Sequence, residues 1–96
     1  MNVTLDGALI LDREMLHDIL SAGLNLPAWY GRNLDALYDC LTDFQTETVI
    51  VLRNRAALEE NLGAYGRSLV RLLGDVFREN ARVRLEVEGE ASEEPS

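Results

Sequence analysis

The chain has 96 residues, of which 47% are hydrophobic and 27% are charged, a length and a composition that fit one soluble globular domain. Seventeen acidic side chains stand against nine basic ones, all of them arginine, and the formal net charge is -8. This acidity argues against a surface for nucleic acid or for an anionic membrane, both of which need a dense basic face, and it favours a basic partner.

The chain offers few side chains for disulfides or metals. Cys40 is the only cysteine and His17 the only histidine, so an intramolecular disulfide is impossible and a structural zinc site lacks ligands. Small secreted domains usually depend on disulfides, and residues 1–7 lack the basic and apolar regions of a signal peptide. No stretch is apolar over the length that a membrane span needs. We therefore expect a cytoplasmic protein without cofactor or metal.

The first quarter of the chain predicts a strand followed by a helix. Residues 2–5 alternate between apolar and polar side chains, which indicates a short strand. Asp12 can cap the next segment, where apolar residues recur at helical spacing, and Gly23 can end it. These signals predict a helix over residues 13–22.

A connector and a second helix follow. In residues 25–32, Pro27 can open a helical turn and Gly31 can close it. Asn33 is well placed as the N-cap of a helix over residues 34–43. The core-facing stripe expected on this helix consists of Leu34, Leu37, Cys40, Leu41 and Phe44.

Two further strands are expected. Residues 48–52 form an apolar, mostly β-branched run without alternation, which predicts a strand covered by helices on both faces. Residues 83–87 alternate and predict a half-exposed strand. Strands separated by helices imply parallel pairing with right-handed crossovers. The predicted fold is α/β, a three-stranded parallel sheet packed with about four helices.

Two helices are expected between these last strands. A short helix ends near Asn61, and Gly63 and Gly66 bracket a loop. A longer helix covers residues 68–80, and because Gly74 within it costs about 1 kcal/mol relative to alanine, close packing is expected there. The core side chains expected on this helix are Leu69, Leu72, Leu73, Val76 and Phe77.

The end of the chain is strongly acidic. Residues 85–96 hold five glutamates and no arginine. From residue 89 onward there is nothing to bury, so we expect a domain over residues 1–88 and an acidic disordered tail over residues 89–96. The tail charges are expected to aid solubility or to tune the approach of a partner.

Three carboxylates mark the second predicted helix. Asp35, Asp39 and Asp43 stand four residues apart, so all three project from nearly the same helix face. Like charges at this spacing destabilise a helix by roughly 0.2–0.5 kcal/mol per pair, and the helix dipole favours only Asp35, at the N-terminal end. A solvated outer face is the simplest interpretation. The other is a surface that presents carboxylates to a basic partner.

Aromatic residues lie beside this acidic face. Trp29 and Tyr30 precede the helix. Tyr38 lies between the first two carboxylates, and Phe44 follows the last. Trp29 or Phe44 taken alone is more typical of a core. Together with the carboxylates, the aromatic residues are typical of a surface that buries area against a protein.

Three other features could carry chemistry. We interpret His17, beside a leucine of the first helix, as a packing or capping residue. Cys40 falls on the core stripe, which favours a small buried side chain over a nucleophile. Asp35 and Asp39 could act as the acid and base of a small enzyme, because paired carboxylates can separate their pKa values. A convex helix face gives such a pair little shelter from water.

The stretch from Leu26 to Thr42 resembles the barstar family, intracellular inhibitors of bacterial secreted ribonucleases. It reads LPAWYGRNLDALYDCLT, against a family pattern of Leu-Pro, two aromatic residues, Gly, any residue, Asn-Leu-Asp-Ala-Leu, an aromatic residue and Asp-Cys-Leu-Thr. Gly7, Leu16–His17 and Val76–Glu79 also fall in register with the family. The resemblance therefore covers nearly the whole chain.

The resemblance implies a barstar-like fold and a protein inhibitor rather than an enzyme. The second helix and the connector before it would plug a basic ribonuclease active site, with carboxylates in the place of RNA phosphate. Asp39 would meet arginines and a catalytic histidine, Asp35 would bind near the guanine-recognition loop, and Trp29 would lie against the histidine. The other implied contacts are Asn33, Leu34, Tyr38, Thr42, Phe44 and, at the periphery, Glu79.

The implied partner is a basic extracellular-type ribonuclease or a related toxin nuclease. The resemblance implies a one-to-one complex, formed by a chain that is a monomer when free and contacts neither nucleic acid nor membrane directly. Arg32 replaces an acidic residue found in the best-known member of the family and places a positive charge beside the contact surface. An immunity protein or a protein-binding module of the same fold, directed at a different partner, is therefore the alternative.

Overall fold

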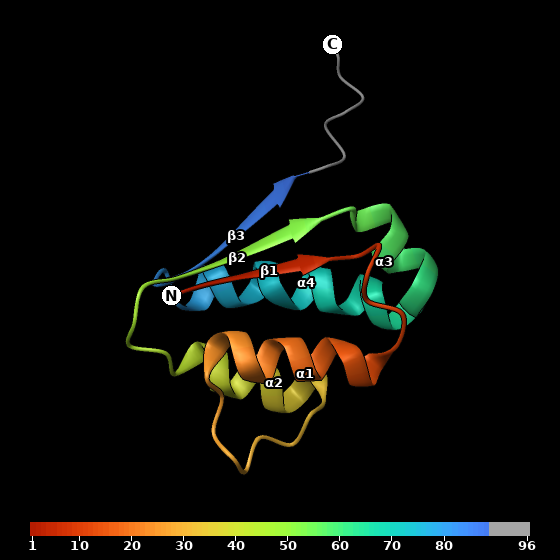
Figure 1. Ribbon diagram of the computed structural model, residues 1–96. Coiled ribbons are helices and arrows are strands. Elements are labelled where there is room, and N and C mark those ends of the chain that lie inside the picture. Colours follow the sequence, from red (N-terminus) through yellow and green to blue (C-terminus); the bar gives the residue numbers. More distant parts are fainter. Residues whose placement is uncertain (89–96) are drawn as a thin grey trace.

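Three parallel strands and four helices make up residues 1–88, the part of the chain that the computed structural model describes (Figure 1). The tail predicted over residues 89–96 lies outside the described residues. In chain order the elements are β1 (Asn2–Asp6), α1 (Arg13–Leu24), α2 (Leu34–Thr42), β2 (Thr48–Arg53), α3 (Arg55–Leu62), α4 (Ala64–Glu79) and β3 (Val83–Glu88). The predicted α/β class and the three-stranded parallel sheet are confirmed.

Within residues 1–88, helices cover only one face of the sheet. β2 is the central strand, and its Ile50 is paired with Val3 of β1 and Leu85 of β3. Figure 1 shows α1, α2 and α4 on the same side of the sheet. Burial alternates along β2, where Ile50 is fully buried and its neighbours Val49 and Val51 are half-buried. The prediction that helices cover both faces is therefore wrong.

The strand order explains why one face stays open. The chain moves from β1 to β2 and then to β3, so both crossovers advance in the same direction across the sheet. Crossovers between parallel strands are right-handed, and two that advance in the same direction place their helices on the same face. An apolar, β-branched run favours a strand whether one or both of its faces are covered. The composition of residues 48–52 therefore could not show how many faces of the sheet carry helices.

The first helix begins as predicted and ends later. Asp12 is the N-cap, and its carboxylate accepts a hydrogen bond from the Met15 amide at 2.9 Å. The helix passes Gly23 and ends before Asn25, whose φ of 53° is left-handed. A Cβ on Gly23 would lie 2.4 Å from Cγ2 of Val3. Gly23 therefore allows close approach of α1 to β1 and is not the helix stop that the sequence suggested.

A single residue joins α3 and α4, where a longer loop was predicted. Gly63 has φ 62° and ψ −136°, a conformation that glycine adopts without strain, and α4 begins directly after it. Gly66 is buried inside the first turns of α4, and a Cβ there would approach the Leu58 carbonyl oxygen at 3.0 Å. The second glycine thus brings two helices together and does not end a loop.

The apolar stripe of α4 is narrower than predicted. Leu69, Leu73 and Val76 are buried, as expected from their spacing. Phe77 is 47% exposed, because it lies on the flank of that stripe. A Cβ on Gly74 would meet nothing within 4 Å, so the close packing predicted at this glycine is absent.

Candidate functional site

α2 is held at its N-terminal end by a cap and a tight turn. Asn33 has extended backbone angles, and its Oδ1 accepts a hydrogen bond from the Ala36 amide at 2.8 Å. Its Nδ2 donates to the Gly31 carbonyl at 3.3 Å. The left-handed residue of the turn is Arg32, with φ 58°, and not Gly31 as the connector suggested. The capping role predicted for Asn33 is confirmed.

The C-terminal end of α2 is fixed by a side chain from another helix. Asn80 follows α4 and is buried, and its Nδ2 donates to the Leu41 carbonyl at 3.0 Å and to the Phe44 carbonyl at 2.9 Å. The Thr42 carbonyl lies 3.3 Å from the same nitrogen. The last carbonyls of a helix have no partner within it, and the Asn80 amide supplies hydrogen-bond donors to them. Asn80 is not among the site residues predicted from the sequence, where its only signal is an amide that follows a predicted helix.

The three carboxylates of α2 are exposed. Among residues 1–88, none of the three, Asp35, Asp39 and Asp43, takes part in an ion pair. Asp35 lies in the first turn, while Asp43 is the C-cap, where the helix dipole is unfavourable to an anion. The helix therefore carries a row of three solvent-facing charges that the described part of the chain does not neutralise.

The charge of Arg32 is directed away from this row. Its guanidinium lies 2.7 Å from a carboxylate oxygen of Asp18 on α1 and donates to the Glu14 carbonyl at 3.2 Å. Both side chains of the pair are largely exposed, so it contributes little to stability. The pair matters for the charge of the surface: Asp18 offsets the positive charge of Arg32, the arginine that lies next to α2 in sequence.

The aromatic residues near α2 divide into surface and core. Trp29 is 79% exposed, so its interpretation as a core residue is excluded. Tyr30, its neighbour, is only 6% exposed and belongs to the core cluster. Tyr38 and Phe44 are half-buried and pack against that cluster while keeping part of their rings at the surface. Trp29, Tyr38 and Phe44 thus flank the carboxylates.

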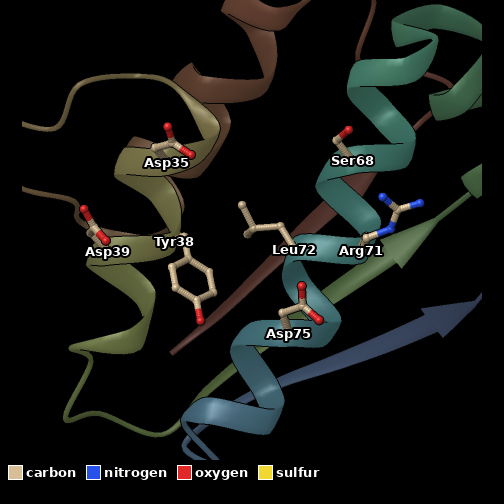
Figure 2. Close-up of a pocket in the computed structure, with 7 residues that line it drawn as sticks. All are labelled: Asp35, Tyr38, Asp39, Ser68, Arg71, Leu72 and Asp75. Carbon is tan, nitrogen blue, oxygen red and sulfur yellow. The ribbon is translucent and has the colours of Figure 1, made fainter.

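Two hollows open on the two sides of α2, and Asp39 lines both of them. The larger, of about 510 Å³, lies between α2 and α4 (Figure 2). It is lined by Asp35, Tyr38, Asp39, Ser68, Arg71, Leu72 and Asp75. The smaller, of about 240 Å³, lies between α2 and the connector and is lined by Pro27, Trp29, Asp39, Cys40, Asp43 and Phe44. Asp39 therefore stands on the ridge between the two hollows.

The wall that α4 contributes was not foreseen. In Figure 2 the side chain of Leu72 points from α4 toward α2, and the ring of Tyr38 lies in the space between them. Arg71 points away from α2. Ser68, Leu72 and Asp75 recur at helical spacing, so their common face could be recognised, but only the packing of α4 beside α2 makes it part of this site.

The other predicted site residues lie outside both hollows. Leu34 is half-buried and packs against the core cluster. The Thr42 hydroxyl donates to the Tyr38 carbonyl at 2.9 Å, so it is used within α2. Glu79 is exposed at the last residue of α4. Like Asn33, these residues are not among those that line the two hollows.

His17 is a packing residue, as the sequence indicated. It is 2% exposed, with Nδ1 2.5 Å from the Tyr30 hydroxyl and Nε2 2.8 Å from the Tyr65 hydroxyl. Burial, and then the charge of Arg32, hold the pKa of His17 below its usual range, while Asp18 opposes them. The Arg13 guanidinium lies 4.2 Å from the Tyr65 ring centroid. The two hydrogen bonds of the imidazole therefore link α1 to the connector, through Tyr30, and to α4, through Tyr65.

Cys40 is also structural. It is buried under α2, and burial raises the pKa of its thiol, with a further increase from the charges of Asp39 and Asp43. A thiol with a raised pKa stays protonated and is a poor nucleophile. Cys40 therefore matches its interpretation as a small buried side chain.

Residues 1–88 contain no group of three or more side chains placed to bind a metal ion. Over the same residues, no helix combines the length and the apolar character that crossing a membrane would take. What the surface around α2 offers is exposed carboxylates, exposed aromatic area and two open hollows. This arrangement suits contact with a basic protein surface.

Comparison with known proteins agrees with the resemblance in the motif. A sequence model of the family described as "Barstar (barnase inhibitor)" matches residues 1–90. The protein named "Putative ribonuclease inhibitor YrdF" from Bacillus subtilis (strain 168) is 36% identical over 78 residues, which cover 80% of this chain and 86% of that protein.

Proposed function

The chain belongs to the barstar family, and we propose that it inhibits a basic microbial ribonuclease of the barnase type by inserting the acidic face of α2 into the nuclease active site. The family relationship makes the chain an inhibitor and not an enzyme, so the use of Asp35 and Asp39 as an acid–base pair is set aside. A cleft that binds RNA phosphate is basic, and carboxylates on a rigid helix can take the place of phosphate in it.

The placement of Asp39 is the observation that carries this proposal. Its carboxylate is exposed, lines both hollows, and makes no ion pair among residues 1–88. Asn33 and Asn80 hold α2 at its two ends, so little backbone conformational freedom has to be lost when the helix binds. An arginine fork of the nuclease can then bind Asp39 with two charge-assisted hydrogen bonds.

The surrounding residues would complete the interface. We assign Asp35 to polar groups near the guanine-recognition loop and Trp29 to the catalytic imidazole, which would contact the part of the exposed indole that does not line the smaller hollow. Tyr38 and Phe44 would add buried area on either side of Asp39. The bordering contacts would come from Asn33, Leu34, Thr42 and Glu79.

The proposal includes the assembly and the place of action. We infer a one-to-one complex with a free chain that is monomeric, acting in the cytoplasm of the bacterium that makes the nuclease. The positive charge of Arg32 was the sequence feature that favoured a different partner. Its pairing with Asp18 removes much of that objection, since the charge lies on the α1 side of the turn.

Substitution of Asp39 by asparagine tests the proposed mechanism. We expect the wild-type chain to abolish barnase activity at near-stoichiometric ratio. Asp39→Asn should raise the inhibition constant by about a hundredfold or more, because it leaves nuclease arginines buried without a counter-charge. The measurement is a titration of RNA cleavage, with circular dichroism to verify that the variant is folded.

A matched control separates the site from net charge. Glu60 is exposed on α3, away from both hollows, and Glu60→Gln removes the same charge. This variant should inhibit within about twofold of wild type, since distant exposed charges are screened by salt. Equal inhibition by Asp39→Asn and Glu60→Gln would contradict the proposed role of Asp39. A folded wild-type chain that binds barnase without inhibiting it would point to a protein-binding module.

A further inference from the structure

The smaller hollow has a composition that suits one kind of side chain. Its walls are the exposed indole of Trp29, the half-buried ring of Phe44, and Pro27. Two carboxylates, Asp39 and Asp43, line it as well. At about 240 Å³ it holds a single large side chain and not a peptide segment.

An arginine side chain satisfies every part of this lining. Its aliphatic stem can pack on apolar walls, its planar guanidinium can stack on an indole, and its five N–H groups can reach carboxylates on one side. A neutral apolar side chain would bury Asp39 and Asp43 without partners, which is costly. An anionic group would meet two like charges. The lining thus favours an arginine.

The charge at Asp43 is not explained by the helix that carries it. Asp43 caps α2 at the carbonyl end, where its amide bonds to the Cys40 carbonyl at 3.2 Å and an anion faces the negative pole of the helix dipole. It also stands one turn from Asp39, a like charge. Both effects are unfavourable to the free chain, and among the described residues the lining of this hollow includes no basic side chain.

We propose that this hollow is a subsite for an arginine side chain of the partner and that Asp43 determines the preference for that residue. The inference rests on the proposed function for the identity of the partner. It goes further by assigning a role to Asp43, which the family motif from Leu26 to Thr42 does not include. Asp39 holds the centre of the interface, and Asp43 adds a second, specificity-determining contact at its edge.

The subsite can be tested without a nuclease. Trp29 is the only tryptophan of the chain, so its indole N–H signal in a proton–nitrogen NMR spectrum reports directly on the hollow. Titration with N-acetyl-arginine methylamide should shift the signals of Trp29 and Phe44, and N-acetyl-norleucine methylamide should not. In Asp43→Asn the shift at a given concentration should fall severalfold, while Glu60→Gln should behave like wild type. Absent or scattered shifts, or an undiminished shift in Asp43→Asn, would overturn the proposal.

The complex provides the second measurement. Against barnase, Asp43→Asn should raise the inhibition constant by about tenfold relative to Glu60→Gln, and much of that change should lie in the dissociation rate. If wild type inhibits barnase and the two variants are equal, the subsite is wrong and the proposed function stands. If wild type does not inhibit barnase, the proposed function fails for this nuclease, and the arginine titration decides the subsite by itself.

Discussion

The carboxylates of α2 lower the stability of the free chain. Asp39 has a like charge one turn away on either side, and Asp43 lies at the unfavourable pole of the helix dipole. Among residues 1–88, neither recovers this cost through an ion pair. Charges that oppose the stability of their own helix are expected where a partner uses them, the usual conflict between stability and function.

His17 shows the opposite case of a titratable group that serves the fold. In the buried imidazole one ring nitrogen donates and the other accepts, so it can satisfy the hydroxyls of Tyr30 and Tyr65 while staying neutral. Protonation would place a charge in the core near Arg32. The neutral form is therefore the one that belongs to the folded chain.

The pKa of His17 predicts how stability depends on pH. Since its folded-state pKa lies below the usual value of 6.5, the unfolded chain takes up the proton first. The contribution is fully present above the unfolded pKa. It declines below pH 6.5 by up to about 1.4 kcal/mol per pH unit, until the folded imidazole is protonated.

Urea unfolding at several pH values between 7 and 5 measures this dependence. His17→Gln should be less stable at pH 7 but should show a smaller decline in the free energy of unfolding, because it has lost the titrating group. Wild type and His17→Gln share the same carboxylates, so the difference between their two declines isolates the imidazole. Parallel declines in wild type and variant would refute the role of His17.

Single residues differed in how far the sequence could predict them. The caps Asp12 and Asn33 were predictable, because a cap is a local arrangement of residue type and neighbouring amides. Trp29 and Tyr30 are adjacent and chemically alike, yet one is exposed and the other buried. Their burial depends on how the connector packs against α1, which no local pattern records.

Among the elements, α2 is unusual in being fixed from outside. Its N-terminal cap comes from its own sequence, but its last carbonyls are bound by Asn80, almost forty residues further along the chain. The segment of α4 and Asn80 therefore has two roles: Asn80 binds the end of α2, and α4 forms one wall of the larger hollow. The position of the acidic face is set by the α2–α4 contact as much as by α2 itself.

Substitution of Asn80 tests this arrangement. Asn80→Ala should lower the free energy of unfolding by about 1–3 kcal/mol, because the Phe44 carbonyl loses the Asn80 donor and the Leu41 carbonyl keeps the Phe44 amide, at 3.2 Å, but loses its side-chain donor. Gln45→Ala removes an exposed amide from the same region and should change stability by less than about 0.5 kcal/mol. The measurement is urea unfolding of both variants, and equal effects would show that the Asn80 amide does not anchor α2.

Element types were predictable from the sequence, and several of their relations were not. Apolar patterns and helix-end signals together located all seven elements of residues 1–88, and the separation of strands by helices predicted the parallel sheet. The sequence suggests that Gly23 ends a helix and that Gly66 ends a loop, whereas both allow close contacts with other elements. A glycine that ends a helix and one that admits a neighbour look the same in sequence, because only the tertiary structure separates them.

On the scale of the whole molecule, the net charge of -8 has two parts. Five of the acidic residues fall within residues 85–96, and Glu88 among them pairs with Arg53 at the end of β2. The row on α2 is smaller in number but fixed in geometry. A general negative field would speed the approach to a basic nuclease and be screened by salt, while under the proposed function the fixed row would determine what is bound.

The candidate site was predicted in its centre more fully than in its extent. The spacing of three aspartates and the aromatic residues around them indicated the surface of α2. The α4 wall, the anchoring by Asn80 and the position of Asp39 between two hollows depend on packing between distant segments. Sequence patterns record which residues share a helix face but not which helix lies beside it.

Displacement of a nucleotide from the nuclease tests the central claim most directly, since the acidic face is proposed to occupy the phosphate site. Barnase is first bound to guanosine 3′-phosphate, the chain is added, and the free nucleotide is measured by equilibrium dialysis. We expect release of one nucleotide per chain bound, with Asp39→Asn releasing far less than Glu60→Gln at equal concentration. A ternary complex in which the nucleotide stays bound with unchanged affinity would contradict it.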